Sequence, residues 1–158
     1  MDFVQDFVNA GEHKHHLELQ FALDDFPAYV RNSRKWVKGI DLPDRWVPYS
    51  QFWLIRDDNV ILGVSGLRHK LNKALRFFGG NIGYKIRPAQ RRNGYGTTIL
   101  KLTLNKAKLL GLSRVLITCD DDNVASAKII EANGGVLKDK TDRHEPGKLT
   151  RRYWIKLK

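Results

Sequence analysis

The sequence predicts one mixed α/β domain over residues 1–158, in which helices cover both faces of a β-sheet. Three observations predict this fold: a β-hairpin pattern over residues 51–67, a strand, turn, helix and strand in succession over residues 82–119, and two closing strand patterns over residues 136–139 and 149–157. The length of 158 residues suits a single domain. We find no internal repeat or linker that would divide the chain.

Two helices are expected before the hairpin. The first ends before Gly11 and has apolar residues at helical spacing, namely Phe3, Val4, Phe7 and Val8. The second has Asp25 as its candidate N-cap and Pro27 in its first turn. Its apolar stripe consists of Phe26, Tyr29, Val30, Trp36 and Val37. Residues 13–23 lie between the two helices and are ambiguous, because their leucines alternate as in a strand.

The hairpin pairs residues 51–57 with residues 60–67 around a tight turn at Asp58 and Asn59. A connector over residues 71–78 follows and ends at two glycines. Residues 82–86 form a third strand. Pro88 closes that strand because proline has no main-chain N–H to donate to a ladder.

A helix is expected from about Gly94 to Leu110, where Gly111 ends it. Its predicted buried side consists of Ile99, Leu100, Ala107 and Leu110, and its wet face of Lys101, Asn105 and Lys108. The apolar strand 114–119 follows, so we expect a right-handed crossover between parallel strands. Asn123 is the candidate N-cap of one more helix, which ends at residues 133–135 before the closing antiparallel pair.

The composition excludes several classes of protein. No apolar run approaches the roughly 18 residues of a membrane span, and the first residues lack the pattern of a secretory signal. The single cysteine, Cys119, excludes an internal disulfide. We therefore expect a cytoplasmic protein without a membrane partner.

A formal net charge of +11 predicts a polyanionic partner, such as nucleic acid or a ligand with several phosphates. The cations concentrate beside a glycine turn, at Arg87, Arg91 and Arg92, and in the tail from Lys138 onward. For the tail, a solvated surface is the plainer interpretation. A nucleic-acid-binding module is the alternative function, in which Tyr153 and Trp154 would stack on bases.

The glycine turn, residues 91–96, predicts an anion-binding site. The first N–H groups of a helix have no internal partner and lie at the positive end of its dipole, and glycine at positions 94 and 96 would let an anion approach them. The third glycine of the Rossmann pattern and the Gly-Lys-Ser/Thr of the Walker pattern are both missing. A plain strand-to-helix turn is the other interpretation.

Two blocks of the sequence together resemble the GNAT superfamily of N-acetyltransferases. The first reads IRPAQRRNGYG from Ile86 to Gly96 and precedes a helix containing Leu100. The second begins with VLIT at residues 115–118, continues with Asn123 at a helix start and ends with Asn-Gly-Gly at residues 133–135. The resemblance implies a GNAT-like twisted mixed sheet of about six to seven strands, whose central parallel strands splay apart to admit the pantetheine arm of acetyl-CoA.

The resemblance also implies a set of coenzyme-binding residues. Main-chain groups of the third strand would meet the pantetheine, the turn and the helix start would bind the pyrophosphate, and the asparagine of the second block would lie near the sulfur or serve as a plain N-cap. These residues are Tyr84, Lys85, Ile86, Arg91, Arg92, Asn93, Gly94, Tyr95, Gly96, Thr97 and Asn123.

The implied reaction is direct attack of an amine on the thioester. Some family members have a tyrosine acid where this chain has Ile130, and some have a glutamate base where it has Asn81. The general acid and base are therefore unassigned, and a coenzyme-binding protein without turnover is a further alternative. Candidate replacements are Ser126, Tyr84, Tyr153, His69 and His144. The acceptor, a small molecule or a peptide, is unidentified, and a homodimer is left open.

We expect no metal cofactor. His13, His15 and His16 have no carboxylate or cysteine at ligand spacing. Residues 120–122 lack the glycine and distal glutamate of a calcium loop. Cys119 ends an apolar strand, which favours an unreactive buried thiol.

The acceptor site is expected to be built from the first two helices, the connector and the tail.

Overall fold

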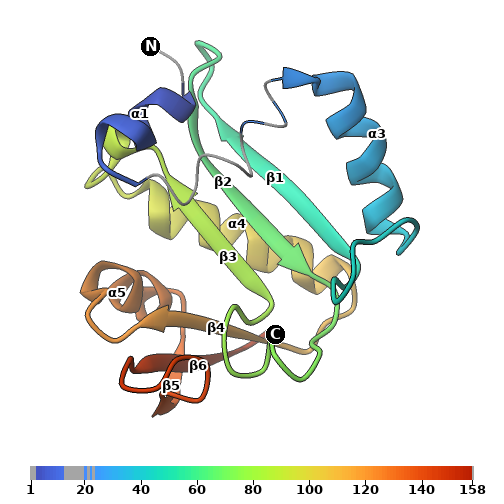
Figure 1. Ribbon diagram of the computed structural model, residues 1–158. Coiled ribbons are helices and arrows are strands. Elements are labelled where there is room, and N and C mark those ends of the chain that lie inside the picture. Colours follow the sequence, from blue (N-terminus) through green and yellow to red (C-terminus); the bar gives the residue numbers. More distant parts are fainter. Residues whose placement is uncertain (1–2, 13–19, 21, 23, 158) are drawn as a thin grey trace.

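Figure 1 shows the computed structural model, which describes residues 3–12, 20, 22 and 24–157. The described strands form two antiparallel sheets with strand orders β1-β2-β3 and β4-β6-β5. The strands are β1 (Tyr49–Ile55), β2 (Ile61–Arg68), β3 (Ile82–Ile86), β4 (Arg114–Asp120), β5 (Val136–Thr141) and β6 (Thr150–Lys156). The helices are α1 (Phe3–Asn9), α3 (Phe26–Val37), the 3-10 turn η2 (Pro88–Gln90), α4 (Tyr95–Leu109) and α5 (Val124–Ala132). A mixed α/β fold is thus confirmed.

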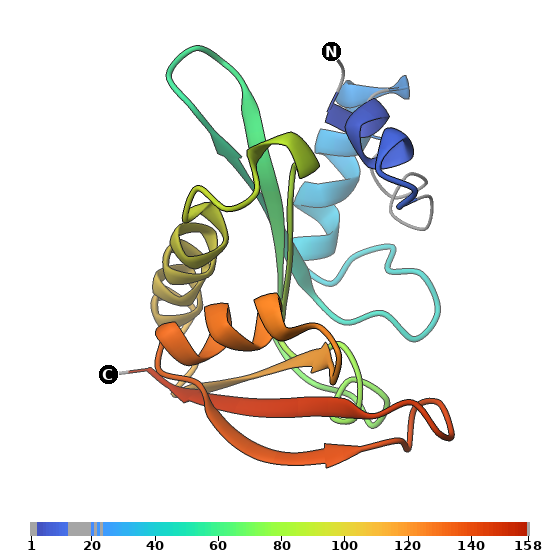
Figure 2. The same ribbon diagram turned by 90° about the vertical axis from the view of Figure 1, so that its left-hand side faces the viewer.

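Helices cover both faces of the first sheet. Figure 2 shows this sheet nearly edge-on, with α4 on one side and α1 and α3 on the other. Asp25 caps α3, because its side chain accepts a hydrogen bond from the Ala28 N–H at 2.8 Å. The predicted α3 stripe is only partly buried: Tyr29 lies in the core, whereas Phe26 is 56% exposed.

The main core lies between the two sheets and the helices α4 and α5. Leu100 and Ala107 of α4, Ile117 of β4 and Ile130 of α5 are among its fully buried side chains. Leu110 was predicted to join this side of α4, and that prediction is wrong: Leu110 is 47% exposed. It is the C-cap residue, one position past the last helical turn.

The two sheets meet where β3 and β4 begin, and Asn81 joins them. The Asn81 N–H donates to the Leu116 carbonyl at 2.6 Å, and the Leu116 N–H donates to Asn81 Oδ1 at 2.9 Å. The Asn81 amide also donates to the Arg68 carbonyl at 3.1 Å. Asn81 itself is buried, so its hydrogen-bonding groups act inside the protein.

Beyond this junction the strands separate. β3 and β4 run in the same general direction in Figure 1 and diverge toward their ends. In the part of the chain that the structure describes, the Asn81–Leu116 contact is the single main-chain hydrogen bond between them. β3 is therefore one edge of the first sheet and β4 one edge of the second. The expected parallel strands are present, but they form no continuous ladder.

The other predicted elements match the structure closely. The hairpin, the third strand and the helices that begin after Asp25, Gly94 and Asn123 all appear within a few residues of the predicted bounds. The ambiguous segment 13–23 falls mostly outside the described residues. Within the described ranges, none of the helices is both long and apolar enough to cross a membrane.

Candidate active site

The glycine turn joins η2 to α4 and presents unpaired main-chain donors. Arg92 and Gly94 both adopt left-handed backbone conformations, with φ of 64° and 78°, and these reverse the chain into the helix. The first hydrogen bond of α4 runs from the Thr98 N–H to the Gly94 carbonyl at 3.1 Å. Across the described ranges, the N–H groups of residues 92–97 meet no acceptor. A helix start of this kind attracts phosphate.

The two glycines of the turn have different roles. A Cβ atom at Gly94 would meet open space, so this glycine serves the left-handed backbone and leaves the approach to the N–H groups clear. A Cβ atom at Gly96 would lie 2.5 Å from Ile129 Cδ1 of α5. The expectation that Gly96 clears space for an anion is therefore corrected, because its missing side chain lets α4 pack closely on α5.

Two of the three arginines beside the turn are already paired with carboxylates. Arg87 forms an ion pair with the buried Asp6 of α1. Arg91 makes a bidentate pair with Glu12, at 2.6 and 2.9 Å, and its Nε donates to the Ile86 carbonyl at 3.2 Å. Among the described residues, Arg92 is the one member of the trio whose guanidinium contacts no carboxylate.

A pair of hydroxyl groups links β3 to α5 on the diverging side of the junction. Tyr84 Oη lies 2.9 Å from Ser126 Oγ. Asn123 caps α5, because its Oδ1 accepts the Ser126 N–H at 3.0 Å. Burial raises the pKa of the Tyr84 hydroxyl to about 12. At neutral pH Tyr84 is therefore protonated and can donate.

The other candidate acids and bases are engaged elsewhere. Tyr153 is fully buried and donates to Glu131 at 2.9 Å, which also excludes it from stacking on bases. His69 shares a hydrogen bond with Ser50 at 2.8 Å, and burial lowers its pKa. His144 stacks on Phe78 with ring centroids 3.9 Å apart. Of the candidate acids and bases, Tyr84 and Ser126 are therefore the two that lie together on the diverging side of the junction.

The positions where relatives place an acid and a base have structural roles in this chain. Ile130 is fully buried in the core, and Asn81 joins the two sheets. Cys119 is 8% exposed, and burial raises its pKa to about 11. An unreactive buried thiol at this position is therefore supported.

The aspartates after β4 bind cations of the β5–β6 hairpin. Asp121 pairs with Lys140 at 2.8 Å and with Arg151 at 2.6 Å, and these two partners, Lys140 first, lower its pKa. Asp120 pairs with Lys148 at 3.2 Å. Within the described ranges, no group of three metal-binding side chains gathers. The three histidines of residues 13–16 lie outside those ranges.

This geometry agrees with the comparison to known families. The family model described as "Acetyltransferase (GNAT) domain" matches residues 7–136. The chain belongs to the GNAT acetyltransferases. No protein of curated function matches its sequence significantly.

Solved structures support the GNAT fold. A putative ribosomal-protein-serine acetyltransferase from Vibrio cholerae is 22% identical, with a TM-score of 0.58 over 82% of this chain and 72% of its own. A spermidine N-acetyltransferase chimera of SpeG from Vibrio cholerae and hSSAT is 15% identical, with a TM-score of 0.62 over 84% and 77%. The putative acetyltransferase yncA from Salmonella typhimurium, solved with its cofactor acetyl-CoA, is 14% identical, with a TM-score of 0.55 over 64% and 61%. At these identities, the likeness shows the fold.

Sequence reasoning did not single out the Tyr84–Ser126 contact or the Asp6 and Glu12 partners of the arginines. Each contact joins residues far apart in the chain, by 42, 81 and 79 positions. The one local signal was the placement of Ser126 three residues after the capping Asn123.

Proposed function

We propose that this GNAT protein is an N-acetyltransferase that moves the acetyl group of acetyl-CoA to an amine. The observation that supports this most directly is the row of unpaired N–H groups at residues 92–97, at the start of a 15-residue helix. A diphosphate supplies the acceptors that these donors lack. Arg92 adds a cation to the same turn.

In this proposal, the pantetheine arm lies along the outer edge of β3, where Tyr84 and Ile86 present main-chain groups. The edge is available because β3 diverges from β4 after the Asn81 junction. The Ile86 carbonyl already accepts a bond from Arg91, so Tyr84 is the better candidate for contact with the pantetheine. Asn123 then holds Ser126 in place at the start of α5.

The proposed reaction begins when the lone pair of a deprotonated amine attacks the thioester carbonyl carbon. A main-chain N–H on the edge of β3 stabilises the oxyanion that forms. The intermediate collapses with cleavage of the C–S bond, and the thiolate leaves with the electron pair. We assign Tyr84, supported by Ser126, as the proton donor to that thiolate. The attacking nitrogen loses one proton and the leaving thiolate gains one, so the number of protons is unchanged. The products are an amide and coenzyme A.

Two alternatives make different predictions. A coenzyme-binding protein without turnover would bind coenzyme A but release no free thiol from acetyl-CoA in the presence of amines. A nucleic-acid-binding module would bind RNA or DNA with a steep dependence on salt. Against the second, Tyr153 is buried, and the tail cations Lys140, Lys148 and Arg151 are paired with aspartates.

The decisive experiment substitutes two glycines at opposite ends of α4. Gly94 and Gly111 have nearly equal φ, 78° and 79°, and a Cβ atom at either position meets open space. Gly94→Val and Gly111→Val should therefore strain the backbone equally and lower the melting temperature to a similar extent.

Only Gly94→Val should affect the coenzyme. We expect its Kd for coenzyme A, measured by calorimetry, to rise at least about 100-fold, because several charge-assisted hydrogen bonds of roughly 1.5–3 kcal/mol each are lost. The Kd of Gly111→Val should stay within about twofold of the wild type. Equal affinities for the two variants would refute the proposed coenzyme site.

Location in the cytoplasm stays a prediction.

A further inference from the structure

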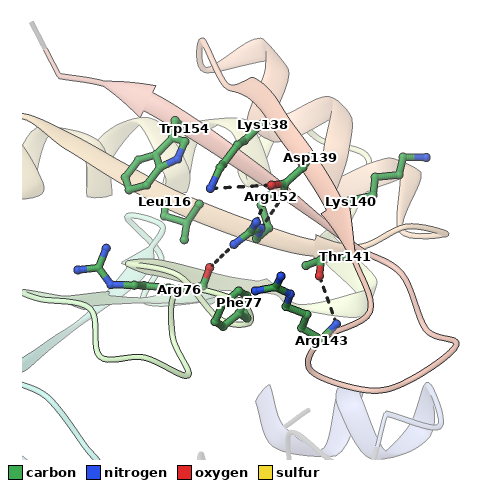
Figure 3. Close-up of a pocket in the computed structure, with 10 residues that line it drawn as sticks. All are labelled: Arg76, Phe77, Leu116, Lys138, Asp139, Lys140, Thr141, Arg143, Arg152 and Trp154. Atoms are coloured by element: carbon green, nitrogen blue, oxygen red, sulfur yellow. Dashed lines mark hydrogen bonds and ion pairs between the residues drawn. The ribbon is translucent and has the colours of Figure 1, made fainter.

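A cavity of about 480 Å³ lies on the second sheet, away from the glycine turn. Leu116 of β4 and Trp154 of β6, which pair across the two strands, line it from the sheet. Arg76 and Phe77 of the connector close another side (Figure 3). The connector and the tail were both expected to build the acceptor site, and in the structure they meet around this cavity.

The cavity opens on the face of the sheet opposite α5. Alternate residues of a strand point to opposite faces. Ile117 and Cys119 of β4 belong to the core cluster that includes Ala127 and Ile130 of α5, whereas Leu116 lines the cavity. The hydroxyl pair and the cavity are thus separated by the thickness of β4.

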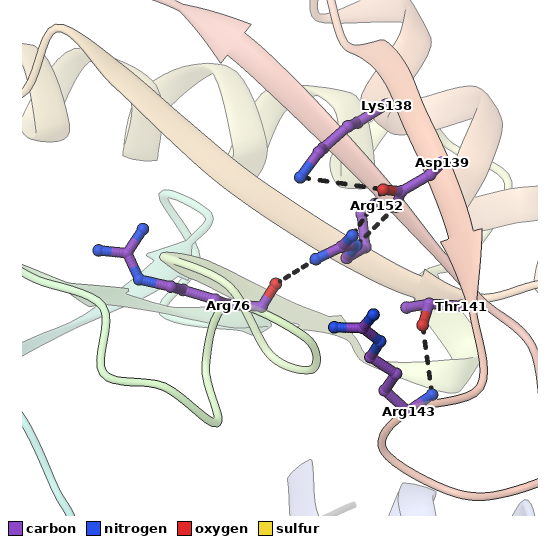
Figure 4. Close-up of polar contacts among 6 residues, drawn as sticks. All are labelled: Arg76, Lys138, Asp139, Thr141, Arg143 and Arg152. Carbon is purple, nitrogen blue, oxygen red and sulfur yellow. Dashed lines mark hydrogen bonds and ion pairs between the residues drawn. The ribbon is translucent and has the colours of Figure 1, made fainter.

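The lining is strongly cationic. It contains one carboxylate, Asp139, and five cations, namely Arg76, Lys138, Lys140, Arg143 and Arg152. Arg152 already holds Asp139 through two hydrogen bonds, the longer of which is 2.6 Å, and it donates to the Arg76 carbonyl at 2.9 Å (Figure 4). Lys140 pairs with Asp121 outside the cavity. The carboxylate is therefore used within the protein, and positive charge remains.

Arg143 is the cation best placed for a ligand. Its guanidinium points into the cavity beside Phe77 (Figure 3), 5.2 Å from the ring centroid. Among the described residues, it makes no ion pair with a carboxylate. A guanidinium in this setting offers paired donors to a carboxylate or a phosphate.

We propose that this cavity holds the anionic group of the acceptor, so that the substrate is an amine that also carries a carboxylate or a phosphate. The inference rests on the proposed acetyl transfer. The anion is held by Arg143, with Lys138, which also forms a 3.8 Å ion pair with Asp139, beside it. The amine extends past the end of β4 toward the thioester. Thr141 of the lining is level with Asp120, the last residue of β4, across the shared strand β6. A polyamine such as spermidine, the substrate named for the chimera above, would be repelled by this lining.

The first test compares three matched series of amines: ω-amino carboxylates, alkylamines and diamines of increasing chain length. Members of equal length differ only in whether the far end is an anion, a methyl group or a cation. We expect kcat/KM, measured by release of free thiol, to be highest for the amino carboxylates and lowest for the diamines at the best length. Equal use of the three series, or a preference for diamines, would overturn the proposal.

Two variants show whether Arg143 causes the preference. Arg143→Glu should raise KM for the best amino carboxylate at least about fivefold, because the attraction between Arg143 and the carboxylate becomes a repulsion. It should leave KM for the matched alkylamine unchanged. Lys101→Glu, on the exposed face of α4, changes the net charge equally and should affect neither amine. A similar loss in both variants would show that only overall charge matters.

Direct binding separates a failure of this inference from a failure of the proposed enzyme. The protein is saturated with coenzyme A, which fills the glycine turn, and titrated with 3-aminopropylphosphonate while backbone amide shifts are recorded by NMR. We expect the shifts of Phe77, Thr141 and Arg143 to move. If coenzyme A binds and these shifts stay fixed, the cavity proposal is wrong. If coenzyme A does not bind, the proposed function is wrong, and movement at these amides still reports on the cavity.

Discussion

The two ends of the β3–β4 pair satisfy their polar groups in opposite ways. At the joined end, the buried Asn81 makes four hydrogen bonds within the protein, two with Leu116 and two with Arg68. At the diverging end, the following turn leaves the N–H groups of residues 92–97 without an acceptor within the described ranges. One end is complete as folded, and the other is chemically incomplete until an anion arrives.

This difference shows where to look for a ligand in a fold of this kind. Unpaired main-chain donors are rare in a folded protein unless water or a ligand satisfies them. A strand pair that is sealed at one end and open at the other directs such donors to one place. The comparison predicts that mutations at the joined end change stability and that mutations at the open end change binding or rate.

The largest effect is expected at the joined end. Asn81→Ala leaves the Leu116 N–H and the Arg68 carbonyl without their side-chain partners, and we expect a loss of about 2–3 kcal/mol in the free energy of unfolding. Asn93→Ala is the matched change at the open end, where the Asn93 side chain makes only long, exposed bonds of 3.3 Å. It should cost less than about 0.5 kcal/mol in urea unfolding. Comparable losses would erase the contrast.

The next largest effect concerns chemistry at the open end. Tyr84→Phe removes the hydroxyl that donates to the thiolate, and we expect kcat to fall at least about tenfold while the Kd for coenzyme A changes little. Because burial raises the pKa of Tyr84 from 10.0 to about 12, the hydroxyl stays protonated well above neutral pH. The wild-type rate should therefore show no loss below pH 10 from ionisation of Tyr84. An unchanged kcat in Tyr84→Phe would exclude this residue as the acid.

A smaller effect tests the division of roles between the two glycines. Gly96→Ala should cost roughly 1–2 kcal/mol of stability, because the new methyl group would lie 2.5 Å from Ile129 Cδ1. Ile129→Val removes the Cδ1 methyl group of Ile129, so the double variant should recover part of the lost stability. A double-mutant cycle measures the coupling. Additive losses would mean that Gly96 does not act through Ile129.

The smallest effect concerns the arginines. Arg92→Gln should weaken coenzyme A binding by about two- to fivefold, as expected for one exposed charge on a phosphate group. Arg91→Gln should weaken coenzyme A binding less than Arg92→Gln does, because the Arg91 guanidinium is already paired with Glu12. Calorimetry at two salt concentrations is the measurement: the loss in Arg92→Gln should shrink at high salt. A loss that is larger for Arg91→Gln would reverse the assignment.

Much of this architecture was readable from local patterns. Helix caps at Asp25 and Asn123, the alternation in the hairpin and the glycine turn each depend on residues a few positions apart, and all appear as predicted. The Arg91–Glu12 pair and the Gly96–Ile129 contact could not be predicted in this way, because they depend on how distant segments pack. For the same reason, the sequence indicated arginines near the turn but not which of them keeps a free charge.

The ion pairs between α1 and the turn have a consequence for selectivity. Asp6 and Glu12 remove two positive charges from the neighbourhood of the coenzyme site and hold the turn in one shape. A loop arranged in this way distinguishes anions by where their oxygens lie more than by how many charges they carry. Other polyphosphates would then compete poorly for the glycine turn with a ligand whose diphosphate has the matching geometry.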